Sequence, residues 1–142
     1  MLKRQGFFML TIEHISNNSL NDKEFKQLYD IIIDAYARTE KEVWGENYVR
    51  VSITDFQKYI DAQEVIVARL DDEMVGGIRV FKLEEGVWSF SLLGAALSAS
   101  GKGVGRSLIQ AAEGLAISKG AQSMRIEVLR ADNISVESKV IL

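Results

Sequence analysis

Apolar and polar positions alternate along the chain in a pattern that predicts a mixed α/β domain. Residues 9–15 alternate as in a strand with one buried face. Residues 65–70 are apolar on both faces, which is typical of a central strand. Segments 74–83 and 87–96 follow through short turns, so the three predict an antiparallel meander in the middle of a sheet. Residues 124–129 alternate again and are expected to form the last clear strand.

Three helices are expected between these strands. Asn21 and Glu24 have capping-box spacing, and the apolar positions behind them fall on one helical face. A second capping box starting at Thr54 predicts a short helix. The third helix is expected from about residue 104 to residue 119, with Gly120 at its C-terminal cap. The fold class is therefore α/β, with a mixed, mostly antiparallel central sheet flanked by helices.

Residues 39–51 show no clean period, and we expect a loop with at most one helical turn there. Its charged residues Glu42 and Glu46 are candidates for a general base, but a charged surface loop is the commoner explanation. Its aromatic residues Trp44 and Tyr48 either line a pocket or pin the loop to the core.

Length and composition fit one domain over residues 1–142. The chain is 47% hydrophobic and 26% charged, and it has no internal repeat or linker. Met9 is a second candidate start, so residues 1–8 are interpreted as an N-terminal extension.

The charge balance and the rare residue types exclude several functions. A net charge of -3 gives no basic surface for nucleic acid or an anionic membrane. No segment has the apolar length of a membrane span or a secretory signal, so we expect a cytoplasmic protein. The chain has no cysteine and one histidine, His14, which excludes thiolate chemistry and a two-histidine metal site. No metal is expected.

Glycines at alternate positions separate the fourth strand from the third helix. Gly101, Gly103 and Gly105 let backbone N–H groups approach an anion, and the helix that follows directs its free N–H groups to the same place. Lys102 and Arg106 add positive charge. This arrangement predicts a site for a phosphate or pyrophosphate group.

The glycine-rich segment does not match either of two common phosphate-binding motifs. A P-loop requires a glycine where Ala96 stands and a hydroxyl residue where Gly103 stands. The dinucleotide fingerprint requires a third glycine where Arg106 or Leu108 stands, and it belongs after a first strand. The remaining alternative is a plain connection without a ligand, although three alternate glycines cost backbone entropy that a simple turn does not require.

The segments LGAAL (residues 93–97) and SGKGVGRSL (residues 100–108) resemble the coenzyme-binding motif of the GNAT superfamily of N-acetyltransferases. The resemblance covers the element order from Met9 to Asn133. It implies the acyl-CoA N-acyltransferase fold and acetyl-CoA as the acyl-donor substrate. One departure is Ser100, which stands where the family usually has arginine or glutamine.

The resemblance also implies where the coenzyme lies. In the family the pantetheine arm lies between splayed fourth and fifth strands. A backbone N–H near Ala95 then polarises the thioester carbonyl, and Gly94 accommodates the local distortion. The cofactor-binding residues implied are Ala95, Ala96, Leu97, Gly101, Lys102, Gly103, Val104, Gly105, Arg106 and Asn133. For Asn133, an N-cap of a following helix is an equally good interpretation.

Catalytic residues stay unknown at this stage. Some relatives use a glutamate on the fourth strand, where this chain offers Ser89 and Ser91. Glu127 either faces the cleft or is a solvated strand residue, and the second reading is preferred. His14 on the first strand is expected far from the splayed strands.

The family pattern continues beyond Leu142, so the C-terminal part is expected to be missing. The residues after Asn133 are expected to open a helix, and its usual proton-donating tyrosine is replaced by Val140. Without further strands, segment 124–129 would have an unpaired edge, which gives a route to a homodimer.

The primary hypothesis is an enzyme that moves an acetyl group from acetyl-CoA to an amine acceptor by direct attack. The alternative is a non-catalytic acyl-CoA-binding or regulatory module of the same fold. A nucleotide-binding domain is third, because the Walker-type lysine and hydroxyl pair is absent. The acceptor is unknown, and neither nucleic acid nor a membrane is expected as a partner.

Overall fold

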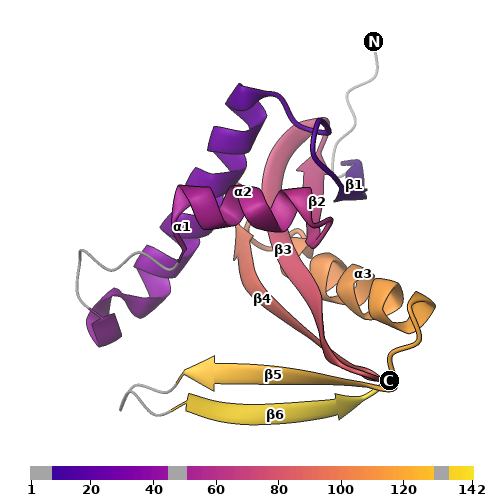
Figure 1. Cartoon of the computed structure of the whole chain (residues 1–142). Helices are drawn as coiled ribbons and strands as arrows, with labels where there is room; N and C mark the ends of the chain where they lie inside the picture. Colours follow the sequence, from indigo (N-terminus) through magenta and orange to yellow (C-terminus); the bar gives the residue numbers. More distant parts are fainter. Residues whose placement is uncertain (1–7, 45–50, 130–134) are drawn as a thin grey trace.

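The computed structural model describes residues 8–44, 51–129 and 135–142, with the backbone alone for 39–44, 127–129 and 135–141. The elements follow in the order β1 (Leu10–Ile15), α1 (Asp22–Trp44), α2 (Ile53–Asp61), β2 (Val65–Leu70), β3 (Glu73–Glu84), β4 (Val87–Ala95), the 3-10 turn η1 (Leu97–Ala99), α3 (Val104–Ser118), β5 (Ser123–Leu129) and β6 (Ser135–Ile141) (Figure 1). The sheet takes its six strands in chain order, and its one parallel pair is β4–β5. The predicted mixed, mostly antiparallel sheet with flanking helices is confirmed.

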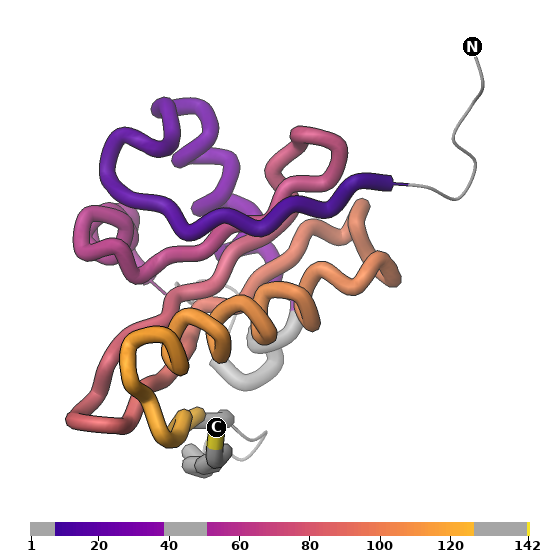
Figure 2. Tube along the Cα trace, turned by 90° about the vertical axis from the view of Figure 1, so that its right-hand side faces the viewer, coloured from indigo at the N-terminus to yellow at the C-terminus, as the bar shows by residue number. Residues whose placement is uncertain are grey.

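Helices cover both faces of the sheet, so the apolar side chains form two cores. Figure 2 shows α1 and α2 on one side of the strands and α3 on the other. Phe56, Leu28 and Ile32 are fully buried in the first core. Leu108 and Ala112 of α3 are fully buried in the second. The central strand β2 contributes side chains to both cores, as its two apolar faces predict.

Helix α1 starts as predicted but ends later than predicted. The Glu24 N–H donates to Asn21 Oδ1 (2.8 Å) and the Asn21 N–H to Glu24 Oε1 (3.2 Å), which completes the capping box. The predicted loop from residue 39 was wrong as far as Trp44, because α1 continues to that residue. A helix that is already nucleated extends through good helix formers without an apolar stripe. Residues 45–50, which include Glu46 and Tyr48, lie outside the described residues.

Helix α2 also starts at a different residue from the one predicted. Its N-cap is Ser52, whose Oγ accepts the N–H of Asp55 at 3.1 Å, so the predicted capping box at Thr54 was wrong. Gln57 does not reach back to the cap; its side chain donates to Asp61 one turn later (2.9 Å). Ser52 and Thr54 both offer a hydroxyl, and burial of Phe56 against α1 selects the earlier start.

The C-terminal residues form a strand, and the predicted helix there was wrong. Strand β6 pairs with β5 from Ser123↔Ile141 to Leu129↔Ser135. The β-branched residues of this segment fit a pleated surface better than a helix. The outer edge of β5 is therefore covered by β6, and the unpaired edge expected for residues 124–129 is not found.

Candidate active site

Strands β4 and β5 are joined at one end and separate from there. Their parallel pairing consists of Val87↔Ser123 and Trp88↔Met124. The Gly86 carbonyl fixes this junction, because it accepts the N–H groups of Gln122 (2.7 Å) and Ser123 (3.1 Å). Beyond Trp88 the strands diverge, as Figure 1 shows, so the β5-facing edge of β4 has no ladder partner among the described residues up to Ala95.

A β-bulge lies in the open part of β4. Gly77 pairs with Gly94 and Arg79 with Ser91, so Ile78 alone faces two residues, Leu92 and Leu93. Leu92 has φ 55°, a left-handed conformation that a leucine adopts at a cost of about 1–3 kcal/mol. The distortion expected at Gly94 therefore lies at Leu92, two residues earlier.

Gly94 is a glycine for a different reason. A Cβ at this position would lie 2.9 Å from the Ile32 Cα, which is helix backbone and cannot turn aside. Gly94 thus lets α1 lie directly on β4. The side chains of α1 are consequently brought to the edge of the opening.

The bulge inverts the alternation of side chains along β4. Before it, Trp88 and Phe90 pack with the α3 core; after it, Leu93 and Ala95 do so. Leu92 is buried in the other core, on the same side as α1. The strand therefore presents even-numbered residues to α3 before the bulge and odd-numbered residues after it.

The N–H of Ala95 points toward the opening. The Ala96 N–H donates to the Val75 carbonyl of β3 (2.7 Å), and successive N–H groups of a strand alternate in direction. The Ala95 carbonyl, on the same open edge, accepts Nη2 of Arg38 at 3.1 Å. Arg38 is held in place by Asp34 one turn earlier on α1 (3.2 Å).

The glycine loop leads from this edge into α3. Leu97, 67% exposed, opens the turn η1, and Gly101 and Gly103 have φ 78° and 76°. Gly103 is the N-cap of α3 and supplies no side-chain acceptor, whereas Asn21 and Ser52 cap α1 and α2. The first N–H groups of α3 are therefore left without a side-chain cap.

Neither the backbone conformation nor any contact within the described residues requires a glycine at position 105. It lies in the first turn of α3 with φ outside the left-handed region, where glycine costs about 1 kcal/mol relative to alanine. A Cβ there would meet nothing within 4 Å, and the same holds at Gly101 and Gly103. Space is thus kept open on one side of the whole loop.

The remaining coenzyme residues expected from the sequence divide into two groups. Lys102 and Arg106 flank the loop, half-buried and exposed respectively. Val104 is buried, and a Cβ at Gly76 would come within 3.0 Å of its Cγ1, so its side chain packs α3 onto the sheet. Only its backbone faces the loop. Asn133 lies outside the described residues.

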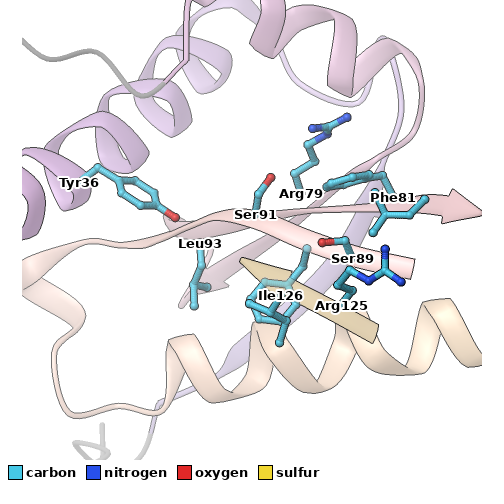
Figure 3. A pocket seen from close by; sticks show the side chains of 10 residues that line it. Tyr36, Arg79, Phe81, Ser89, Ser91, Leu93, Arg125 and Ile126 are labelled. Atoms are coloured by element: carbon cyan, nitrogen blue, oxygen red, sulfur yellow. The ribbon is translucent and has the colours of Figure 1, made fainter. Parts of the chain in front are cut away.

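A cavity of about 460 Å³ lies where β4 and β5 diverge. Figure 3 shows side chains from α1, β3, β4 and β5 around it. The lining residues are Tyr36, Arg79, Phe81, Leu83, Ser89, Phe90, Ser91, Leu93, Arg125 and Ile126. The Tyr36 hydroxyl points toward Ser91 and Leu93, next to the bulge.

Two arginines line this cavity, and each is paired with a carboxylate that is outside the lining. Arg79 lies between the rings of Tyr59 (3.7 Å) and Phe81 (3.9 Å), and its Nε donates to Glu64 Oε1 at 2.9 Å. Arg125 of β5 pairs with Glu84 at 3.3 Å. Among the described residues, the lining includes neither a carboxylate nor an imidazole.

Other sequence candidates lie away from the opening. His14 is on β1, at the far edge of the sheet from β5, and its Nε2 makes a 2.6 Å hydrogen bond with the Gln63 carbonyl. The side chain of Glu127 lies outside the described residues. In the described part of the chain, no group of three metal-binding side chains occurs. None of the described helices has the length and apolar character needed to cross a bilayer.

The chain belongs to the acetyltransferase (GNAT) family, whose sequence model matches residues 25–137. This span includes the bulged strand, the glycine loop and the opening between β4 and β5. Among curated proteins, no significant match to the chain exists.

Solved structures with the same fold include several acetyltransferases. An aminoglycoside 6'-N-acetyltransferase complexed with coenzyme A is 21% identical with a TM-score of 0.63, over 84% of this chain and 63% of that one. N-acetylglutamate synthase from Neisseria gonorrhoeae, with coenzyme A and N-acetyl-glutamate, is 14% identical with a TM-score of 0.63, over 87% and 26%. An aminoglycoside acetyltransferase from an uncultured soil metagenomic sample, in complex with sisomicin, is 22% identical with a TM-score of 0.65, over 87% and 80%. The chain thus spans less than two thirds of the first two proteins.

Sequence reasoning missed the residues that shape the cavity. Tyr36 appears in the sequence as one more apolar position of a helical face, and Arg79 and Arg125 as polar strand residues. An arginine within the apolar meander was the one available signal, because a charge next to buried positions needs a partner. Which element supplies that partner is not encoded locally.

Proposed function

We propose that this chain binds acetyl-CoA and transfers its acetyl group directly to an amine acceptor. The pyrophosphate lies at the uncapped start of α3, between Lys102 and Arg106. The pantetheine arm lies along the open edge of β4, and the thioester carbonyl lies near the N–H of Ala95. The amine approaches from the cavity that Tyr36 and Arg79 line.

The observation that carries the proposal is Gly105. Positive φ accounts for Gly101 and Gly103, but neither φ nor packing requires a glycine at 105. A ligand that touches the backbone of the first turn does require one, because any Cβ would stand between the anion and the N–H groups. The family relationship favours coenzyme A as that ligand.

Catalysis in this arrangement rests on position. The Ala95 N–H stabilises negative charge on the thioester oxygen, and the bulge at Leu92 directs the open edge toward the acceptor cavity. The acceptor loses a proton before or during attack, since an ammonium group is not a nucleophile. The proposal assigns no general base, because the described lining offers hydroxyl groups and arginines only.

A second candidate is a non-catalytic acyl-CoA-binding module. The absence of a carboxylate or imidazole from the described lining favours it. So does Ser100, which supplies no cation to the pyrophosphate. Release of the coenzyme thiol in the presence of an amine distinguishes the two functions, because a binding module releases none above the rate of spontaneous hydrolysis.

The test is calorimetric titration of the protein with acetyl-CoA, CoA and ATP, repeated with Gly105→Asp. We expect both coenzymes to bind and ATP not to bind. The new carboxylate faces the pyrophosphate and should weaken binding by at least about 100-fold through like-charge repulsion. An acid in the first turn of α3 favours the helix, so the variant should keep its thermal midpoint.

Gly114→Asp is the matched control. Gly114 lies on the exposed side of the same helix with nothing within 4 Å of a Cβ, so this variant adds the same charge away from the loop. Its coenzyme affinity should equal that of the unmodified protein. Absence of coenzyme binding by the unmodified protein, or equal loss in both variants, contradicts the proposal.

A further inference from the structure

The charged side chains that line the cavity beside β4 are both cationic, although the protein as a whole is acidic. The chain carries a net charge of -3, yet Arg79 and Arg125 line the cavity and no described acidic side chain does. A buried or half-buried surface of one sign selects ligands of the other sign and repels those of its own. The arginines in the lining therefore favour an acceptor that carries a negative charge.

Arg79 is fixed in position before any ligand arrives. Its guanidinium is held between two aromatic rings and by Glu64, and 20% of its side chain is exposed. Glu64 engages Nε, and within the described part of the chain no hydrogen bond to Nη1 or Nη2 is made. The pair of Nη atoms is the fork that binds a carboxylate through two parallel hydrogen bonds.

Arg125 holds its carboxylate partner weakly. Its Nη2 lies 3.3 Å from Glu84 Oε1, and 60% of the Glu84 side chain is exposed. Ion pairs of this kind contribute little, because water and salt compete with them. Arg125 therefore contributes a second cationic side chain to the lining without a strong ion pair to Glu84.

The cavity has two chemically different ends. In Figure 3, Tyr36 and Leu93 lie at the end next to the bulge, whereas Arg79 and Arg125 lie at the other end. The register agrees, since Arg79 pairs with Ser91, before the bulge, and Ala95 lies after it. An amine near the thioester therefore has the arginines on its other side.

We infer that the acceptor is a small amine that carries a carboxylate, of the α-amino acid class, and that Arg79 binds this carboxylate. The inference rests on the proposed acetyl transfer and adds the substrate class. It also excludes polycationic amines such as aminoglycosides and polyamines, because a second ammonium group would lie against two arginines.

The experiment measures release of the coenzyme thiol with acetyl-CoA and a panel of acceptors. The panel contains the common amino acids, the carboxamide of each, spermidine and kanamycin. Each amino acid and its carboxamide share the amine and the side chain and differ in the carboxylate. We expect kcat/KM to be at least about 10-fold higher for the preferred acid than for its carboxamide, and turnover of the polycations to be absent.

Arg79→Met should reduce the ratio of kcat/KM for acid over carboxamide to about one, mainly through KM. Arg79→Lys keeps the charge without the fork and should give an intermediate ratio. Because loss of Arg79 leaves Glu64 unpaired, the double variant Arg79→Met/Glu64→Gln separates recognition from folding. Lys26→Met, an exposed position on α1, removes one positive charge away from the cavity and should leave the ratio unchanged.

Coenzyme titration of every variant distinguishes failure of the proposed acetyl-CoA site from failure of the inferred acceptor class. Failure of the unmodified protein to bind acetyl-CoA defeats the proposed function itself. Coenzyme binding with equal use of acids and carboxamides, with turnover of polycations only, or with no amino acid turned over, overturns the inference and leaves the coenzyme site standing.

Discussion

The two edges of β4 are made from the same residues and have opposite roles. Toward β3 the strand is paired over nearly its whole length, from Val87 to Ala95. Toward β5 it is paired at Val87 and Trp88 alone. The paired edge contributes stability, and the open edge leaves backbone groups such as the Ala95 N–H to a ligand. A binding site for an extended molecule can therefore be made by leaving part of a sheet unpaired.

The sharpest test of this comparison is a pair of proline substitutions at adjacent residues. Ala95→Pro removes an N–H from the open edge, and Ala96→Pro removes the N–H that donates to Val75. We expect turnover of Ala95→Pro to fall about 100- to 1,000-fold, as when one oxyanion donor is lost, with a modest change in urea midpoint.

Ala96→Pro should behave in the opposite way. Its φ of -65° already suits proline, so the main loss is the hydrogen bond to β3, about 1–3 kcal/mol with a carbonyl left unsatisfied. Similar losses of turnover in the two variants at equal stability would mean that the edges do not differ in function.

A smaller effect is expected from Gly94→Ala, which tests how closely α1 lies on β4. The added Cβ meets Ile32 backbone at 2.9 Å, so we expect a destabilisation of about 1–3 kcal/mol in urea unfolding. Gly114→Ala is the control, because the same added methyl group on the open side of α3 should stabilise by up to about 1 kcal/mol. Changes of the same sign at both positions would contradict the close packing.

The smallest effect concerns Glu24, which lies at the start of α1 near the β1 edge of the sheet, away from the opening. The hydrogen bond from the Asn21 backbone N–H, and then pairing with Arg69 (3.0 Å), hold the pKa of Glu24 below its ordinary value of 4.5. A lowered pKa in the folded state stabilises the protein above the unfolded-state pKa, and this stability is lost as the pH falls through the folded-state pKa.

Glu24→Gln should therefore lower the free energy of unfolding by about 1 kcal/mol at neutral pH, and the difference from the unmodified protein should shrink below pH 4.5. Urea unfolding at a series of pH values measures it. Coenzyme affinity at neutral pH should not change, and a pH-independent difference in stability would contradict the assignment.

The coenzyme side could be predicted from the sequence because it is made locally. Gly101, Gly103 and Gly105 are within five residues of one another, and strand, loop and helix follow in chain order. Backbone groups do the binding there, so the glycines that expose them are visible as a motif. The meander and the Asn21 cap were predictable for the same reason.

The acceptor side could not be predicted because it is made by tertiary contacts. Tyr36, Arg79 and Arg125 come from three elements, and only the packing of α1 on Gly94 and the divergence of β5 bring them together. The bulge at Leu92 left no signal either, because leucine is a poor indicator of positive φ. The hydroxyl that caps α2 was likewise decided by burial of Phe56.

The bulge at Leu92 divides β4 into two stretches whose side chains alternate in opposite phase. A one-residue deletion anywhere between Ser89 and Leu93 would remove the bulge and restore plain alternation along the whole strand. Gly94 would still face Ile32 of α1, and Ala95 would still face α3, because the deleted residue is the one by which the two stretches differ in phase. Such a deletion therefore keeps the contact with α1 but removes the bulge from the open edge, whereas a one-residue deletion that leaves the bulge in place would turn every residue beyond it to the opposite face.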